Sequence, residues 1–115
     1  DDLRNSKDVV LAAVRQNGNA LKYASNAMKN TEEVVRAAVA RNGNALKHAS
    51  DAMKNNRTVV VAAVAQDAFA LQYASSKQKR NFDVVCTALK RNPVAAKYVS
   101  QDFIIASLAL AGAVK

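Results

Sequence analysis

The residues that could act as nucleophiles, bases or metal ligands do not form a catalytic pattern in this sequence. Cys86 is the only cysteine, and no histidine or acid is arranged beside it to activate its thiol. His48 is the only histidine. No acid–base pair, metal-ligand cluster or phosphate-binding loop is evident. We therefore predict that the chain is not an enzyme, that it has no metal or cofactor, and that it has no small-molecule substrate.

Basic side chains are the groups best suited to bind a partner. The chain has 17 Lys and Arg against 9 Asp and Glu, a net charge of +8, and residues 76–100 alone contain six basic groups and one acidic group. A clustered positive surface attracts nucleic acid, anionic lipid or acidic proteins. Such lysines also keep Ala-rich helices soluble, and no aromatic residue is interleaved with them for base stacking. The candidate partner-binding residues are Lys22, Lys29, Lys47, Lys54, Lys77, Lys79, Arg80, Lys90, Arg91 and Lys97.

Two other kinds of polar residue recur at a constant spacing of 25 residues. Aromatic rings occupy one such position and could line a groove that grips a peptide; alternatively, each ring packs between helices with its tip in water. Serines occupy the other position, where we expect each hydroxyl to bond to the carbonyl four residues earlier, which is Leu21 for the first copy. These two sets are Tyr23, His48, Tyr73 and Tyr98, and Ser25, Ser50, Ser75 and Ser100.

The same period predicts the helices that position these side chains. Good helix N-caps recur at Ser6, Thr31, Asn56 and Asn81. In the first copy Val9, Val10, Ala13 and Val14 then cover one side of a helix. The adjoining position accepts residues of any type, which predicts that it lies outside the core. Its members are Leu11, Arg36, Val61 and Cys86.

A second helix is predicted to begin after Asn17, Asn42, Asp67 and Asn92. These residues could close the first helix or cap the second, but Pro93 cannot take the positive φ of a glycine C-cap, so an N-cap explains every copy. Each helix would have about ten residues, too few to be stable alone. The helices must therefore stack on one another.

The sequence thus predicts an all-α chain. Its architecture would be an α-solenoid of four 25-residue helical hairpins with a half repeat at the C-terminus. The repeats, called units 1 to 4 below, are approximately 5–29, 30–54, 55–79 and 80–104, and a terminal helix covers 105–115. Together they form one domain, 1–115, which we expect to be a piece of a larger protein. The apolar segment 103–114 is expected to seal unit 4.

The motif Asn5-Ser6-Lys7-Asp8-Val9-Val10-Leu11-Ala12-Ala13-Val14, followed by Gln16-Asn17-Gly18-Asn19-Ala20-Leu21-Lys22-Tyr23-Ala24-Ser25, closely resembles a known repeat family. That family is catalogued as domain of unknown function 4116. The resemblance covers all four copies. It implies an accessory helical repeat module of large proteins of intracellular bacteria, including secreted effectors, and of protists. It implies no catalytic residues.

We therefore expect a non-catalytic protein-interaction scaffold within a larger, effector-type protein. The alternative is binding of nucleic acid or an anionic membrane through the basic face of unit 4. The single cysteine, the absence of a signal peptide at residues 1–4 and an apolar run shorter than about 20 residues favour a soluble protein of cytoplasmic type. Its compartment would be the host cytosol if it belongs to a secreted effector.

Overall fold

The computed structural model describes residues 3–99, 103 and 105, and every regular element in this part of the chain is a helix. The all-α prediction is confirmed. The longest helices have ten residues each and begin at 25-residue spacing, as the apolar pattern predicted. They are α1 (Lys7–Gln16), α3 (Glu32–Arg41), α5 (Arg57–Gln66) and α6 (Phe82–Arg91).

A six-residue 3-10 helix follows each long helix after a single linking residue. These elements are η2 (Gly18–Tyr23), η3 (Gly43–His48), η4 (Ala68–Tyr73) and η6 (Pro93–Tyr98). Shorter elements then lead to the next long helix. They are η1 (Leu3–Asn5), α2 (Asn26–Lys29), α4 (Asp51–Lys54) and η5 (Gln78–Arg80).

The second helix of each unit therefore differs from the continuous helix of about ten residues that we predicted. In unit 1 it breaks at Ala24 and Ser25, whose backbones are extended. The Ser25 hydroxyl accepts the backbone N–H of Met28, so this serine is the N-cap of α2 and not a residue inside a helix. The predicted bond from Ser25 to the Leu21 carbonyl is wrong, because the Ser25 hydroxyl donates its one proton to Asn5 Oδ1. A serine hydroxyl that bonds to the backbone favours such breaks.

The linking residue before each 3-10 helix is an N-cap, as predicted. Its side-chain oxygen accepts a backbone N–H two residues later, from Asn19, Asn44, Phe69 or Val94 at 2.9 to 3.1 Å. No described glycine has a positive φ, which agrees with a cap of the second helix rather than a glycine C-cap of the first. The caps of the long helices are less uniform. Asn56 and Asn81 accept a backbone N–H, whereas Ser6 and Thr31 make no side-chain cap bond.

Removing one of these caps should measurably weaken the fold. We expect Asn42→Ala to cost about 1 kcal/mol of unfolding free energy, because it removes the acceptor of the Asn44 N–H. Urea unfolding followed by circular dichroism measures this change. Asn26→Ala is the matched control, because it removes an exposed amide in the body of α2. An unchanged midpoint for Asn42→Ala would contradict the role of the cap.

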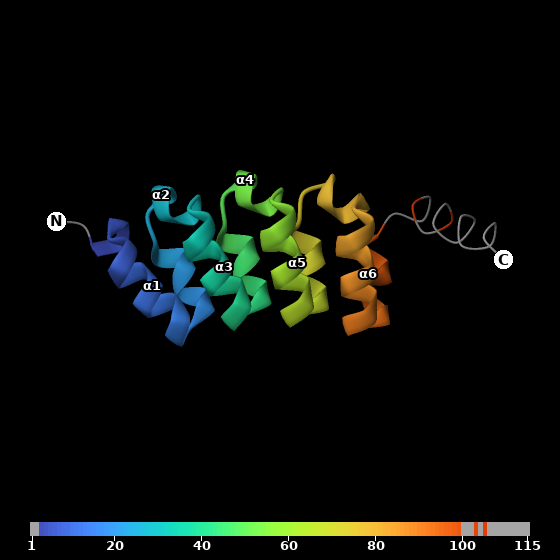
Figure 1. Cartoon of the computed structure of the whole chain (residues 1–115), viewed down its shortest axis with the longest axis horizontal. Coiled ribbons are helices and arrows are strands. Elements are labelled where there is room, and N and C mark those ends of the chain that lie inside the picture. The colour runs from blue at the N-terminus through green and yellow to red at the C-terminus, as the bar shows by residue number, and fades with distance from the viewer. Residues whose placement is uncertain (1–2, 100–102, 104, 106–115) are drawn as a thin grey trace.

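The long helices stand side by side in a row, as Figure 1 shows, with the N-terminus at one end of the molecule. Helix α1 contacts α3, α3 contacts α5, and α5 contacts α6, while the 3-10 helices contact their neighbours in the same order. The structure measures 59 × 21 × 20 Å along its principal axes. Each unit therefore packs mainly on the units before and after it.

The core runs along this row between the long helices and the 3-10 helices. Leu21, Leu46 and Leu71 are fully buried at the same position of successive units. Leu11 is only 6% exposed, so the prediction that its position lies outside the core is wrong for unit 1. Val61 and Cys86 are half-buried at this position, and Arg36 is exposed. The position lies at the edge of the core, where an apolar side chain packs inward and an arginine extends into water.

The predicted terminal helix 105–115 lies outside the described residues, apart from Ile105, which is exposed. Phe103 is partly buried and packs against the core. Residues 104 and 106–114 are not described, so the seal of unit 4 by segment 103–114 stays a prediction. Within the described residues, no helix has the length and apolar character needed to cross a membrane.

Candidate functional site

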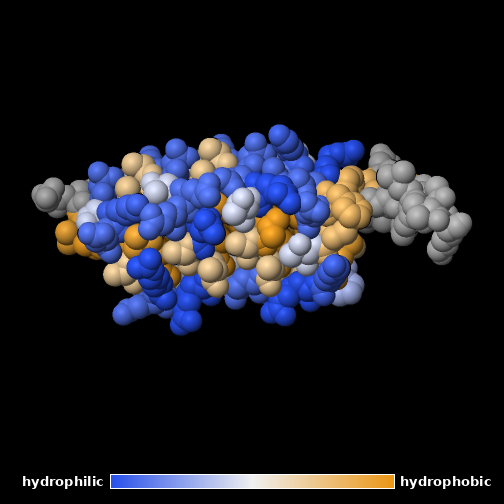
Figure 2. Space-filling model, in the orientation of Figure 1, coloured by the Kyte–Doolittle hydropathy of each residue, from blue (hydrophilic) through white to orange (hydrophobic). Residues whose placement is uncertain are grey.

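Four lysines of units 1 and 2 lie near His48, the last residue of η3, because the charges of all four act on it. Lys22 is in η2 and Lys47 in η3, one unit apart, while Lys29 in α2 and Lys54 in α4 are related in the same way. We call these four residues the lysine strip. Figure 2 shows that the surface over α2 and α4 is mostly hydrophilic.

The electrostatic environment of His48 indicates that these four charges act on one place. Burial of the imidazole lowers the pKa of His48 below its usual value, and the positive charges of Lys47, Lys29, Lys22 and Lys54 lower that pKa further. This environment favours the neutral form of the imidazole. The positive charge of the strip comes from the lysines.

The cations on the long helices have a different environment. Lys7 pairs with Glu33 and lowers the pKa of that carboxyl through a hydrogen bond and its charge. Arg57 pairs likewise with Asp83 in the next unit. Arg41 donates to the Gln16 carbonyl.

These cations of the long helices are thus used within the protein. By contrast, no member of the lysine strip forms an ion pair with a described acid. The strip is therefore a surface of positive charge that the described part of the chain does not neutralise.

The six basic residues of segment 76–100, in and just before unit 4, do not form one surface. Lys77 precedes η5, and Lys79 and Arg80 lie within it, just before α6 begins. Lys90 and Arg91 lie in the last turn of α6, roughly 15 Å away along a ten-residue helix. Arg91 also donates to the Gln66 carbonyl, a contact between units. The structure therefore divides the predicted basic face of unit 4 between the two ends of α6.

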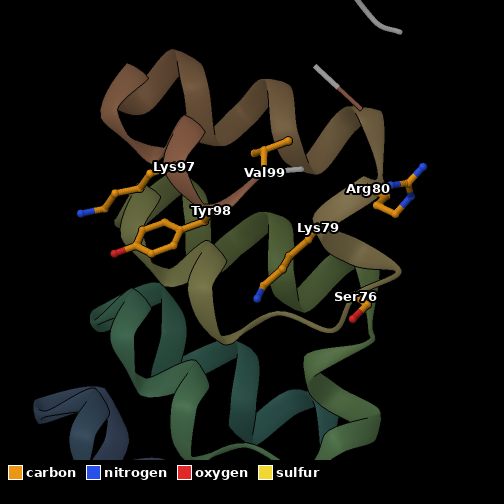
Figure 3. A pocket seen from close by; sticks show the side chains of 6 residues that line it. All are labelled: Ser76, Lys79, Arg80, Lys97, Tyr98 and Val99. Carbon is orange, nitrogen blue, oxygen red and sulfur yellow. The ribbon is translucent and has the colours of Figure 1, made fainter. Parts of the chain in front are cut away.

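Lys97 joins Lys79 and Arg80 at a cavity of about 360 Å³, which Ser76, Tyr98 and Val99 also line. Three cations and two hydroxyls would suit an anion if they converged. Figure 3 shows that Lys97 and Arg80 point in opposite directions from this cavity. Their arrangement does not form a convergent anion site.

The predicted aromatic set occupies the last position of each 3-10 helix. Tyr23 is 65% exposed and lies under the Lys22 ammonium, which is 4.9 Å from the ring centroid. Tyr98 packs edge-on against Phe69, with ring centroids 6.1 Å apart, and Lys97 lies over both rings. His48 and Tyr73 are half-buried. Tyr23 and Tyr98 line different cavities, in units 1 and 4.

Sequence reasoning missed a set of hydrogen bonds that ties the first residue of a unit to its serine. Ser25 Oγ donates to Asn5 Oδ1 at 2.8 Å, and Ser50 donates to Asn30 in the same way at 2.6 Å. The pair Ser75 and Asn55 repeats this contact at 2.6 Å. The backbone N–H of each of these serines also donates to the carbonyl of the residue just before that asparagine, which for Ser50 and Ser75 lies in the preceding unit. The recurrence of asparagine 20 residues before the first three serines was the available signal.

The two lone candidates for chemistry lie on different elements. Cys86 is a half-buried free thiol on α6, and His48 is the last residue of η3. Among the described residues, no three His, Cys, Asp or Glu side chains lie close enough to hold a metal ion.

Comparison with known proteins gives one match. The profile of a family described as "Domain of unknown function (DUF4116)" matches residues 1–29 and 31–79. No curated protein and no solved structure matches the chain.

Proposed function

Because the chain belongs to the family described as Domain of unknown function (DUF4116), we propose that it is a non-catalytic repeat module that acts as a protein-interaction scaffold. In this proposal the fold is an α-solenoid of four 25-residue units, and the module serves a larger, effector-type protein. The contacts of each long helix with the next support a solenoid, because stacked units bury their apolar faces on their neighbours. Such stacks present extended surfaces suited to long partners.

The observation that supports this function best is the lysine strip. Its four ammonium groups form no ion pair with an acid in the described part of the chain, whereas Lys7, Arg36 and Arg57 on the long helices are paired. Unpaired charge of one sign on a rigid surface selects partners of the opposite charge and accelerates their association. We propose that the partner is an acidic protein segment that lies along units 1 and 2.

The aromatic residues favour a protein partner over single-stranded nucleic acid. Proteins that bind single strands stack successive bases on free aromatic faces. Here Tyr23 is the only one of the four rings that is largely exposed, and Lys22 lies over one of its faces. Tyr98 packs against Phe69 under Lys97. Binding of nucleic acid or of an anionic membrane is therefore an alternative outcome of the test below.

Neutralising the lysine strip should weaken binding of an acidic peptide by at least about tenfold at low salt. The variant is Lys22→Gln, Lys29→Gln, Lys47→Gln and Lys54→Gln together. Fluorescence anisotropy with a labelled 20-residue peptide rich in glutamate measures the affinity. Circular dichroism checks that the variant remains helical.

The matched control removes the same total charge from the long helices, through Lys7→Gln, Arg36→Gln, Arg57→Gln and Lys90→Gln. Exposed ion pairs contribute little to stability, so this variant should fold and should lose less affinity than the strip variant. Equal losses in the two variants would overturn the assignment of the strip. Binding of single-stranded nucleic acid or phosphatidylserine vesicles, without binding of the peptide, would replace the protein partner with the alternative.

A further inference from the structure

Unit 1 exposes an apolar face at the N-terminal end of the molecule. Val9 and Ala13 of α1, together with Ala20 and Tyr23 of η2, line a small open cavity of about 170 Å³. Val9 is 43% exposed, and Figure 2 shows hydrophobic residues at this end. A face of this kind on a charged protein indicates an interaction site.

The positions of Val9, Ala13 and Ala20 are buried in every later unit. Val34 and Val59, one and two units after Val9, have no exposed surface, and neither has Ala38, one unit after Ala13. They are buried because α3 packs on α1, α5 packs on α3, and the 3-10 helices pack in the same order. The exposed face of unit 1 is therefore the surface with which units 2 to 4 contact the unit before them.

Part of that contact already exists in unit 1. Residues 3–5 form η1, at the place that residues 28–30 occupy for unit 2. The Arg4 carbonyl accepts the Ser25 N–H, and Asn5 accepts the Ser25 hydroxyl, as Lys29 and Asn30 do for Ser50. We call the interface between one unit and the unit before it a joint. At the N-terminal end of unit 1 the hydrogen bonds of such a joint are present, whereas its apolar surface is uncovered.

We propose that this face is the docking site of a further helical unit of the same pattern. The shape of the joint specifies the turn of that unit. Gly18 lies so close to the Ala38 carbonyl and to Asn42 that a Cβ atom there would collide with them. On the exposed face, Ala13 and Asn17 are the counterparts of Ala38 and Asn42. The docking unit therefore needs a glycine, or a residue nearly as small, in its turn.

A second copy of this chain, stacked end to end, fits the face less well. Its unit 4 would have to approach Ala13, and Pro93 occupies the position of Gly18 there. A pyrrolidine ring cannot approach a carbonyl as closely as glycine does. This inference extends beyond the proposed acidic partner, because it concerns the end of the stack and not the lysine strip.

The test compares the chain with a version extended by one unit, in which a second copy of residues 5–29 is inserted between Arg4 and Asn5. We expect the amides of the original α1 to exchange with solvent more slowly in the extended chain. Val9→Lys at the original position should leave the urea midpoint of the unextended chain nearly unchanged. The same substitution should clearly lower the midpoint of the extended chain and cancel the protection of α1.

A matched control carries Gly18→Val in the inserted copy alone, where the larger side chain should block docking and leave α1 as open as in the original chain. If Val9→Lys changes the urea midpoint of neither the original nor the extended chain, the proposal is overturned. The proposal would also be overturned if the original chain formed concentration-dependent dimers that Val9→Lys dissociates. The occupant of the face would then be a second copy of the chain. Neither result would alter peptide binding at the lysine strip, so this proposal and the proposed function can fail independently.

Discussion

Gly43→Val is expected to destabilise the protein by roughly 3 kcal/mol, the largest effect that we predict for a single substitution. A Cβ atom at Gly43 would overlap the carbonyl oxygen of Ala63 in the next unit and would lie 3.1 Å from the backbone nitrogen of Asp67. Both of these atoms belong to the backbone, so a change of side-chain rotamer cannot relieve the collision. Units 2 and 3 would have to move apart. Urea unfolding gives the free energy directly.

The cost at Gly43 should come from this collision and not from backbone strain, because no described glycine has a positive φ. Ala68→Gly, one unit later, is the matched control. It removes a methyl group at the same position and should cost less, roughly 0.5 to 1 kcal/mol, mainly through the greater freedom of the unfolded chain. A midpoint of Gly43→Val equal to that of the unmodified chain would show that the two units are not in close contact.

Val35→Ala is expected to cost roughly 1 to 3 kcal/mol, because it removes two methyl groups from a fully buried site in α3 and leaves a cavity. Arg36→Ala, at the next position, should be nearly silent. The Arg36 side chain is exposed, and its ion pair with Glu32 is long and solvated.

Thermal or urea unfolding of the two single variants measures the difference. Equal destabilisation at the two sites would mean that α3 presents another side to the core. Far-ultraviolet circular dichroism of both variants confirms that the comparison concerns the same helical state.

The long helices and the caps after them could be predicted from sequence because the signals are local. Val34 and Val35 define one side of a helix, and the asparagine or aspartate at 17, 42, 67 and 92 suits an N-cap whatever surrounds it. Pro93 excluded the competing glycine C-cap. These features depend on residues within a few positions of one another.

The break at Ser25 could not be predicted in the same way, because a serine in this context can lie inside a helix or cap one. The choice depends on Asn5, which is 20 residues away in sequence and accepts the hydroxyl proton. The burial of Leu11 also depends on the tertiary structure. Predicting it would have required knowing where the edge of the core lies.

The lysine strip could be anticipated in part. Lys22 and Lys29 are seven residues apart, the spacing of one face of a continuous helix, and the charges of both act on His48 although the two lysines belong to separate elements. Lys90 and Lys97 have the same spacing, yet the turn at Asn92 separates them. Spacing alone therefore did not distinguish the strip from the divided charges of unit 4.

The Gly18, Gly43 and Ala68 series has a consequence for the curvature of the molecule. Glycine occupies this position in units 1 and 2, where a Cβ atom would collide with the next unit, and alanine occupies it in unit 3. We expect the methyl group of Ala68 to hold units 3 and 4 slightly farther apart on this side of the row than the earlier units are held. A wider spacing on one side bends a row of units toward the other side, so exchanging glycine and alanine at these positions should change its curvature.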